Sequence, residues 1–475
     1  NLSQSPNIVS CYPDLTVDAT GRVHAVWVEP LVLEQIASPG NAYRNYAGSE
    51  GTIQYATWQD GSWSAPVDIV YEQQSIILPS IAVDSYGAVH LVYWYGGSLL
   101  YIHSLPGGRA SSARDWSRPI NLSERFYTYP NRFPNLVVDS AGILHLIFTG
   151  RAQDLLGDSQ GTQVWYSRSD DGGQSWMAPV LVSTHSDNLF ASRSYDANFA
   201  VDAHSGLHLV TVEDDTIVYT RSLDGGRTWS KGLPVSADPG QAYRAGYVSA
   251  VGDEVHLFWG DIKRGLYHRW SSDEGTTWSG AAQLSAEGPT FYGGIATASD
   301  GLGRLLVVYP YEDDLWSRIW NGETWSEPTN VSRDLGKLSF WPRVVISGGN
   351  IAHLVWYTGF AELALYDALD RMSRGEYEIH YAQRRLEAPA LASASYQATE
   401  TAGVVPTETP SPKITSTTVL STATAPTRSA TPYEAGPPPT LAIDPQRSVL
   451  VGVLVGVGAA LALVVVIGVV AVRRR

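Results

Sequence analysis

The chain has 475 residues and carries 47 acidic against 32 basic side chains. This formal net charge of −15 repels nucleic acid and anionic lipid, so we expect no nucleic-acid partner. A single cysteine, Cys11, excludes an intrachain disulfide, and the 44 glycines, 27 prolines, 16 tryptophans and 26 tyrosines are typical of an all-β protein with many short strands around a broad core.

A short unit recurs along the first part of the chain. Its first copy, YPDLTVDATGRVHAVW from Tyr12, consists of two alternating apolar runs joined by a turn with Gly and Asp, which predicts a β-hairpin. Close copies begin at Leu78, Phe133 and Asp196, and weaker copies begin at Gly246, Gly293 and Trp341. A second hairpin follows each of the first six copies, whereas one further strand, EIHYAQRRL, follows the seventh.

The last unit is predicted to be completed from the other end of the chain. The segment SPNIVSCYP, which starts at Ser5, resembles the fourth-strand segments RPINLSERFYTYP and EPTNVSRDLGKLSFWP of two internal units. Repeated four-stranded units, with the last closed by an N-terminal strand, predict a seven-bladed β-propeller over residues 1–387. Closure hides the sheet edges that would otherwise pair with other chains.

Three turns in these units share the pattern S-x-D-x-G-x-[ST]-W. They read SDDGGQSW, SLDGGRTW and SSDEGTTW, and they lie between the third and fourth strands of blades three, four and five. The aspartates Asp171, Asp224 and Asp273 are expected to bond backbone amides within tight turns. Because a catalytic residue is needed once per site and not once per blade, the repetition indicates a structural role.

Six histidines hold equivalent places in the repeated unit, namely His24, His90, His145, His208, His256 and His353. The first four follow an aspartate by six residues in each unit. Buried polar groups need partners, so we expect an Asp–His contact that braces each turn. We therefore expect neither a metal site nor a cofactor.

The repeated octet resembles the Asp-box, the bacterial neuraminidase repeat of sialidases and related propellers, across residues 1–387. In that family the box lies on the face away from the ligand. The resemblance implies three arginines that hold a sugar carboxylate, a Tyr–Glu nucleophile and an Asp acid–base. The family's enzymes have six blades and an Arg-Ile-Pro motif, whereas this chain repeats seven units and offers only PNRFP from Pro130, so its catalytic residues remain unassigned.

The ligand face is expected to be the one opposite the boxes. Arginine and aromatic residues precede several innermost strands there, and the candidate ligand-binding residues are Tyr129, Arg132, Arg193, Tyr195, Tyr243, Arg244, Trp341 and Arg343. Acidic groups occur in short loops at 213–215, 261 and 312–314, and long loops at 28–51 and 357–376 would form a wall or lid in blades one and seven. Aromatic platforms beside polar groups suit a carbohydrate, and a solvated acidic rim is the alternative.

The composition changes after about residue 387. Residues 388–447 are rich in Ser, Thr and Pro, which predicts an extended disordered stalk. The uncharged run 448–472 is long enough to be a transmembrane helix, and the arginines at 473–475 would form a cytoplasmic tail. A sorting signal that is cut after export is the alternative.

In both cases we expect a single-pass cell-membrane protein or a related surface protein whose head is extracellular. Such a topology needs a signal peptide, so the chain is expected to be the processed form.

Two functions remain open from the sequence. The first is a surface recognition or scaffold protein that binds a glycan or a surface protein on the loop face. The alternative is a tethered exo-glycosidase of the exo-alpha-sialidase type. The fold does not decide between them, but three arginines converging on one point above a Tyr–Glu pair would indicate the enzyme.

Overall fold

The computed structural model describes residues 1–5, 10–30, 50–74, 76–106, 110–126, 128–152, 163–184, 198–213, 216–236, 243–261, 265–286, 294–333, 337–360 and 378–392. It describes the backbone alone at 125–126, 128–133, 151–152, 184, 243–245, 261, 337–338, 340 and 359–360. All of these residues belong to one compact unit, Asn1–Thr399. Of the predicted stalk, residues 388–392 are described, and the rest of the stalk and the predicted transmembrane helix lie outside the described residues.

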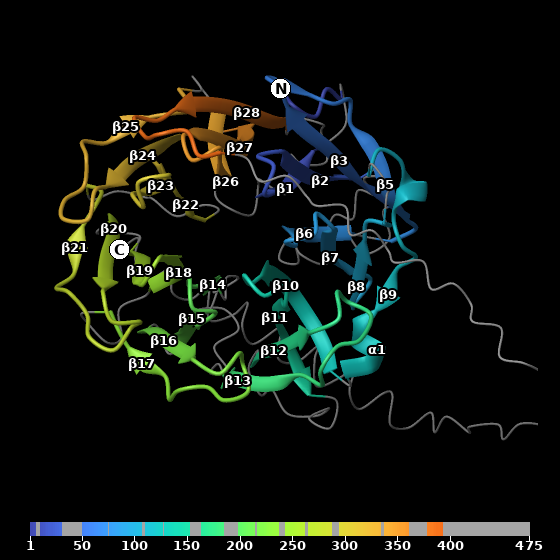
Figure 1. Cartoon of the computed structure of the whole chain (residues 1–475), viewed down its shortest axis with the longest axis horizontal. Coiled ribbons are helices and arrows are strands. Elements are labelled where there is room, and N and C mark those ends of the chain that lie inside the picture. Colours follow the sequence, from blue (N-terminus) through green and yellow to red (C-terminus); the bar gives the residue numbers. More distant parts are fainter. Residues whose placement is uncertain are drawn as a thin grey trace, which may run out of the picture. The chain divides into compact units, whose positions relative to one another are not determined.

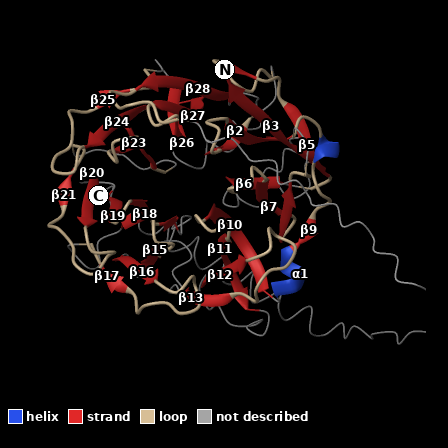
Figure 2. Cartoon of the chain, viewed as in Figure 1, coloured by secondary structure: helices blue, strands red, loops and turns tan. Residues whose placement is uncertain are grey.

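The described strands form seven antiparallel sheets, and each sheet is one blade of a β-propeller (Figures 1 and 2). Blade one contains β1 (Cys11–Val17), β2 (Val23–Pro30) and β3 (Gly51–Gln59), with β4 (Ser62–Trp63) and β5 (Val67–Glu72) both paired to β3. Blade two contains β6 (Ile76–Val83), β7 (Val89–Tyr95), β8 (Ser98–His103) and β9 (Ile120–Asn121). Blade three contains β10 (Thr128–Val138), β11 (Leu144–Ala152), β12 (Gln163–Ser169) and β13 (Val180–Thr184).

The remaining blades follow the same order. Blade four contains β14 (Asn198–Val201), β15 (Leu207–Glu213), β16 (Thr216–Ser222) and β17 (Leu233–Pro234). Blade five contains β18 (Tyr243–Val251), β19 (Glu254–Asp261), β20 (Gly265–Ser271) and β21 (Ala282–Gln283). Blade six contains β22 (Ala296–Ser299), β23 (Leu305–Tyr311), β24 (Asp314–Trp320) and β25 (Thr329–Asn330), and blade seven contains β26 (Lys337–Ser347), β27 (Ile351–Phe360) and β28 (Glu378–Arg385). The short helices η1 (Ala113–Asp115) and α1 (Leu122–Phe126) flank β9.

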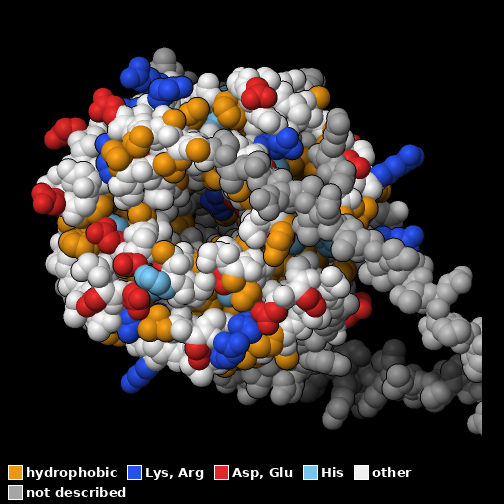
Figure 3. All heavy atoms as spheres, viewed as in Figure 1, with side chains coloured by type: hydrophobic (Ala, Val, Ile, Leu, Met, Phe, Trp, Pro, Cys, Tyr) orange, Lys and Arg blue, Asp and Glu red, His pale blue; other side chains and the backbone are white. Residues whose placement is uncertain are grey.

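The first strand of each blade lies at the centre of the ring, and Figure 3 shows the opening that these strands surround. Strand β1 contacts both β6 of blade two and β26 of blade seven, so the ring is closed. The second strands are buried on both faces, as in β2, because each blade packs against two neighbours. The apolar clusters accordingly lie between blades, for example Val92 with Leu146 and Phe148 between blades two and three. The sequence prediction of an all-β, seven-bladed propeller is confirmed.

The N-terminus closes blade seven, although not with the segment that the sequence suggested. The Leu2 amide donates to the Ile379 carbonyl at 2.7 Å, as the Val331 amide donates to the Leu315 carbonyl at 2.8 Å in blade six. Residues Asn1–Ser3 therefore occupy the fourth-strand position, in place of the segment that starts at Ser5. They read NLS, as at 121–123 in blade two, where the triplet spans the end of β9 and the start of α1.

Alternate strands of an antiparallel blade run in the same direction, so the ring has two different faces. We call the face with the turns between first and second strands and between third and fourth strands the turn face. The loop face carries the connections between second and third strands and between blades. The three octets therefore lie on the turn face, where they were expected.

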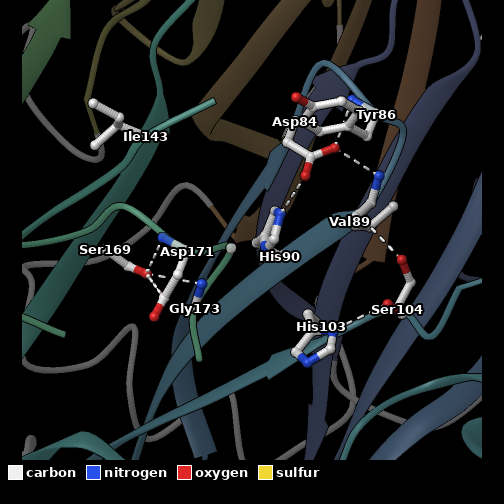
Figure 4. A network of polar contacts seen from close by, with 12 residues as sticks. Asp84, Tyr86, Val89, His90, His103, Ser104, Ile143, Ser169, Asp171 and Gly173 are labelled. Carbon is white, nitrogen blue, oxygen red and sulfur yellow. Dashed lines mark hydrogen bonds and ion pairs between the residues drawn. The ribbon is translucent and has the colours of Figure 1, made fainter. Parts of the chain in front are cut away.

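Each octet is a hydrogen-bonded turn built around its aspartate, and Figure 4 shows the octet of blade three. In blade three the Ser169 hydroxyl donates to Asp171 Oδ1 at 2.8 Å and accepts from the Gly173 amide at 2.8 Å. The Ser175 hydroxyl donates to the other carboxylate oxygen of Asp171 at 2.6 Å. The same bonds recur around Asp224 and Asp273. A structural role for the three aspartates accounts for all of these contacts.

A polar relay connects each of these turns to the preceding blade. In blade two, Asp84 Oδ2 lies 3.3 Å from His90 Nε2, and His90 Nδ1 lies 2.8 Å from the Tyr101 hydroxyl (Figure 4 shows the Asp84–His90 pair). The Tyr101 hydroxyl donates to the Gly172 carbonyl in the octet of blade three, at 3.1 Å. The ring of Trp176 from the same octet packs edge-on against Tyr101, with centroids 5.4 Å apart.

The relay is repeated around the ring. Its Asp–His contacts are Asp18–His24 at 3.4 Å, Asp139–His145 at 3.3 Å and Asp202–His208 at 3.0 Å. The expected Asp–His contact is therefore confirmed in the first four units. Blade five differs, because His256 contacts Glu254 at 3.2 Å and His268 at 3.0 Å, and in blade seven His353 contacts the Ser347 hydroxyl at 2.7 Å.

The described chain leaves the propeller on the turn face. The Leu386 amide donates to the Asn350 carbonyl at 2.7 Å, and the Leu391 amide donates to the Gly348 carbonyl at 2.8 Å. Both acceptors lie in the turn between β26 and β27. Within the described part of the chain, no helix has the length and apolar character needed to cross a bilayer.

Candidate ligand-binding cavity

The innermost strands of all seven blades line a central cavity of about 550 Å³. Most lining residues are apolar or uncharged, as expected where alternate side chains of a strand point toward the ring axis. Among the described lining residues, two carry a charge at neutral pH, Asp14 of β1 and Arg343 of β26. Figure 3 shows a basic side chain in the depth of the opening.

Asp14 and Arg343 form an ion pair between blades one and seven. Arg343 Nε lies 3.2 Å from Asp14 Oδ1, and the Ile81 amide of β6 donates to Asp14 Oδ2 at 2.9 Å. Burial raises the pKa of Asp14, while the Arg343 guanidinium and the Ile81 amide act in the opposite direction. One carboxylate in the cavity wall thus joins three consecutive blades.

Part of this arrangement is architectural. Ser80, at the same position of blade two, accepts a hydrogen bond from the Leu136 amide at 3.0 Å. Asn198, at the same position of blade four, accepts one from the Val248 amide at 2.8 Å. A polar side chain that accepts from the next innermost strand is therefore a recurring blade contact. Blade seven departs from this pattern, because its residue at the same position, Arg343, is a cation and not a hydrogen-bond acceptor.

Aromatic rings lie beside the ion pair. Tyr12 of β1 packs edge-on against Trp341 of β26, with centroids 5.7 Å apart and an interplanar angle of 77°. The guanidinium carbon of Arg343 lies 5.6 Å from the centroid of Trp341. Tyr357 lies behind both rings, with its centroid 6.4 Å from each. Tyr12 and Trp341 line the cavity, whereas Tyr357 is buried.

The backbone explains how these large side chains reach the cavity mouth. Tyr12, Leu78 and Trp341 each precede a proline and adopt φ values of +53°, +54° and +59°. The strand register shifts at each of the three positions, as in a β-bulge that re-aims a side chain. A left-handed conformation costs a non-glycine residue about 1–3 kcal/mol, and such strain is found at functional sites more often than elsewhere. The bulges thus place Tyr12, Leu78 and Trp341 around one side of the cavity, in blades one, two and seven.

The structure brings two of the predicted ligand-binding residues to the cavity, Trp341 and Arg343. It places Tyr129 and Arg132 in β10, and Tyr243 and Arg244 in β18, and describes their backbone only. Arg193, Tyr195 and most of the two long loops lie outside the described residues.

Sequence reasoning missed Tyr12 and Asp14. Both were visible as the counterparts of Trp341 and Arg343 in the repeat, because YPD at 12–14 aligns with WPR at 341–343.

Among the acidic loop residues whose side chains are described, Glu213 and those at 312–314 do not line the cavity. Glu213 accepts from the Thr211 hydroxyl at 3.2 Å and from Ser183. Asp314 accepts from Asn330 Nδ2 at 2.6 Å and from the Ser332 hydroxyl at 2.8 Å. These two carboxylates therefore support the ends of their own blades. Across the described residues, His, Cys, Asp and Glu side chains form no group of three that could hold a metal ion.

No protein-family model matches the chain, and no curated protein matches its sequence. Solved structures do match. The BP39L lectin from Burkholderia pseudomallei has a TM-score of 0.51 at 13% identity, over 83% of this chain and 99% of the lectin. A protein of unknown function from Dyadobacter fermentans has a TM-score of 0.47 at 14% identity, over 80% and 96% of the two chains. The NanB sialidase from Streptococcus pneumoniae has a TM-score of 0.46 at 12% identity, over 81% and 69%. The likeness to the lectin concerns the propeller fold, and function must be argued from the site.

Proposed function

We propose that the propeller is a carbohydrate-recognition head that binds a glycan at the loop-face mouth of its central cavity. The observation that carries this proposal is the corner formed by Tyr12 and Trp341, with Arg343 beside the Trp341 ring. An aromatic platform next to a few fixed polar groups is typical of a site that packs the apolar face of a sugar and hydrogen-bonds its hydroxyls.

The alternative is an exo-glycosidase of the sialidase type. Such an enzyme needs arginines that are free to hold the sugar carboxylate, and Arg343 is already paired with Asp14 at 3.2 Å. The Asp-box resemblance of the octets concerns the turn face and does not supply catalytic residues. Recognition is therefore the function that the described geometry supports best.

We also propose that the head is displayed at the cell surface by the stalk 388–447 and the apolar run 448–472. The uncharged run and the arginines at 473–475 support this placement. The described chain leaves the head at Leu391, on the turn face.

The test is glycan binding by the full chain, on an array of neutral and sialylated glycans, beside hydrolysis of a fluorogenic sialoside. We expect binding without turnover, and we expect Trp341→Ala to weaken binding at least tenfold, since it removes one wall of the corner. Tyr86→Ala is the matched control, because Tyr86 is an exposed aromatic residue in a turn-face loop. If the protein hydrolyses the sialoside and Arg343→Ala abolishes this turnover, the protein is a hydrolase. If the folded protein binds no glycan, the proposal is overturned.

A further inference from the structure

We infer that the cavity mouth selects an uncharged pyranose over a sialic acid or another anionic sugar. This inference rests on the proposed function and adds the chemical class of the ligand. Its first support is the charge of the cavity: Asp14 and Arg343 are the charged residues among the described lining, and their charges cancel.

The second support is the state of the Asp14 carboxylate. Its Oδ1 faces Arg343 Nε and its Oδ2 accepts from the Ile81 amide, so both oxygens are engaged. The side chain of Asp14 is only 16% exposed. A ligand carboxylate that took Arg343 would leave this partly buried anion without its counterion, next to a second anion. Removing one partner of such a pair is costly.

The third support is the geometry of the guanidinium. Arg343 Nε points to Asp14, and Nη1 donates to the Pro342 carbonyl at 3.0 Å. An arginine grips a carboxylate best with two parallel N–H donors of one edge. With Nε and Nη1 both engaged inside the protein, Nη2 remains as the group best placed to donate to a ligand. A single donor suits a hydroxyl or a ring oxygen better than a carboxylate.

The walls of the mouth fit the same class of ligand. Tyr12 and Trp341 meet at 77°, so one ring can cover the face of a pyranose while the other covers its edge. Two further lining residues, Ser80 of β6 in blade two and Asn198 of β14 in blade four, are uncharged. Each already accepts a backbone hydrogen bond, but each keeps a donor, a hydroxyl hydrogen or an amide NH₂, for sugar oxygens.

The experiment is titration of the full chain with methyl pyranosides of neutral sugars and with the methyl glycoside of N-acetylneuraminate. We expect the wild type to bind at least one neutral glycoside about tenfold or more tightly than the sialoside, a difference that a single unpaired charge can produce. Trp341→Ala should weaken neutral binding about tenfold, and Tyr86→Ala should leave it unchanged.

The decisive variant is Asp14→Asn. It keeps an oxygen that can accept from the Ile81 amide, frees Arg343 and gives the described lining a net positive charge. We expect it to gain about tenfold in affinity for the sialoside, and this gain should fall as NaCl is raised. A purely structural role for Asp14 would produce no such gain.

The other outcomes bear on the inference in different ways. Tighter binding of the sialoside than of any neutral sugar by the wild type, dependent on Trp341, overturns the neutral class and keeps glycan recognition. No glycan binding by folded protein overturns the proposed function itself. If Asp14→Asn does not fold, the salt dependence of the wild type decides: an affinity for the neutral glycoside that stays constant as NaCl is raised supports the inference, and a marked fall contradicts it.

Discussion

The hydroxyl of Tyr101 in blade two donates a hydrogen bond to the main-chain carbonyl of Gly172 in blade three, at 3.1 Å. The same link joins Tyr166 to Gly225 at 3.2 Å and Tyr219 to Glu274 at 3.3 Å. Each link fastens the third strand of one blade to the octet of the next. The octets thus act between blades as well as within their own turn.

Removing one of these tyrosine hydroxyls should lower the stability of the propeller. Tyr101→Phe keeps the packing against Trp176 but leaves the Gly172 carbonyl and His90 Nδ1 without a partner. We expect a loss of about 1–3 kcal/mol in the free energy of unfolding, the usual cost of an unsatisfied buried polar group. Chemical denaturation measures it, with Tyr86→Phe as the exposed control. An equal effect in both variants would contradict the role of the relay.

Gly173 of the octet should not tolerate a side chain, because of its backbone conformation and also because it packs closely against Tyr101. Gly173 has φ +88°, and a Cβ added there would lie 1.9 Å from the Tyr101 hydroxyl. Gly61 has φ +87°, and a Cβ there would meet nothing within 4 Å. Gly61→Ala should cost about 1–2 kcal/mol for the left-handed conformation alone. Gly173→Ala should cost a further 1–3 kcal/mol or so for overpacking.

The comparison of these two variants by chemical denaturation isolates the steric term. In the double variant Gly173→Ala, Tyr101→Phe, the loss of the tyrosine oxygen should relieve part of the clash. If Gly61→Ala and Gly173→Ala lose the same free energy of unfolding, the close packing of Tyr101 against Gly173 does not contribute to the cost of the substitution.

Closure by the N-terminus gives a third prediction. Leu2 is 4% exposed and belongs to the same apolar cluster as Ile379. Leu2→Ala should lower the free energy of unfolding by about 2–5 kcal/mol, as for other buried leucines. Leu391→Ala is the control, because Leu391 is 54% exposed near the other end of the described chain. Limited proteolysis should also cleave blade seven first in the Leu2 variant, and unchanged proteolysis would argue against closure by Asn1–Ser3.

Acidification should destabilise the propeller head already between about pH 6.5 and pH 4, because two buried histidines resist protonation there. Burial lowers the pKa of His256 and of His353 to about 4, whereas an unfolded histidine titrates near about 6.5. Between these values the unfolded chain binds protons that the folded chain does not bind. Stability is therefore complete above about pH 6.5 and is lost progressively as the pH falls toward 4.

Thermal unfolding at pH 7.5 and at pH 4.5 tests this dependence. His353→Gln should lower the melting temperature at pH 7.5, because it disturbs the contacts with Ser347 and Tyr381, but should reduce the further drop at pH 4.5. A drop as large as that of the wild type would exclude His353 as a source of the pH dependence.

The repeat made most of the fold predictable. The Asp–His spacing and the octets recur in several units, so each copy supports the interpretation of the others, and the contacts of His24, His90, His145 and His208 followed from it. The closing segment was misplaced because the proline and apolar residues after Ser5 resemble the internal units. The hydrogen bond to β28 comes instead from Leu2 in the NLS triplet at residues 1–3.

The candidate site was less predictable, because it depends on departures from the repeat. One position of the innermost strand holds a small polar residue in blades two, three and four, namely Ser80, Asn135 and Asn198. It holds Asp14 and Arg343 in the two blades that meet at ring closure. Their pairing requires the ring to be closed, which no local pattern encodes. The ligand-binding roles of Tyr129, Arg132, Arg193, Tyr195, Tyr243 and Arg244 stay predictions.

The Leu2–Ile379 hydrogen bond has a topological consequence. In a row of stacked repeats with free ends, each terminal unit has one uncovered side and needs a special cap. In this chain, blades one and seven cover each other, so the first and last units can keep the ordinary repeat sequence. Without Asn1–Ser3, blade seven would keep an unpaired outer edge on β28, where the backbone of another molecule could add as a strand. The hydrogen bond of Leu2 thus covers part of an edge that would otherwise be open to strand addition.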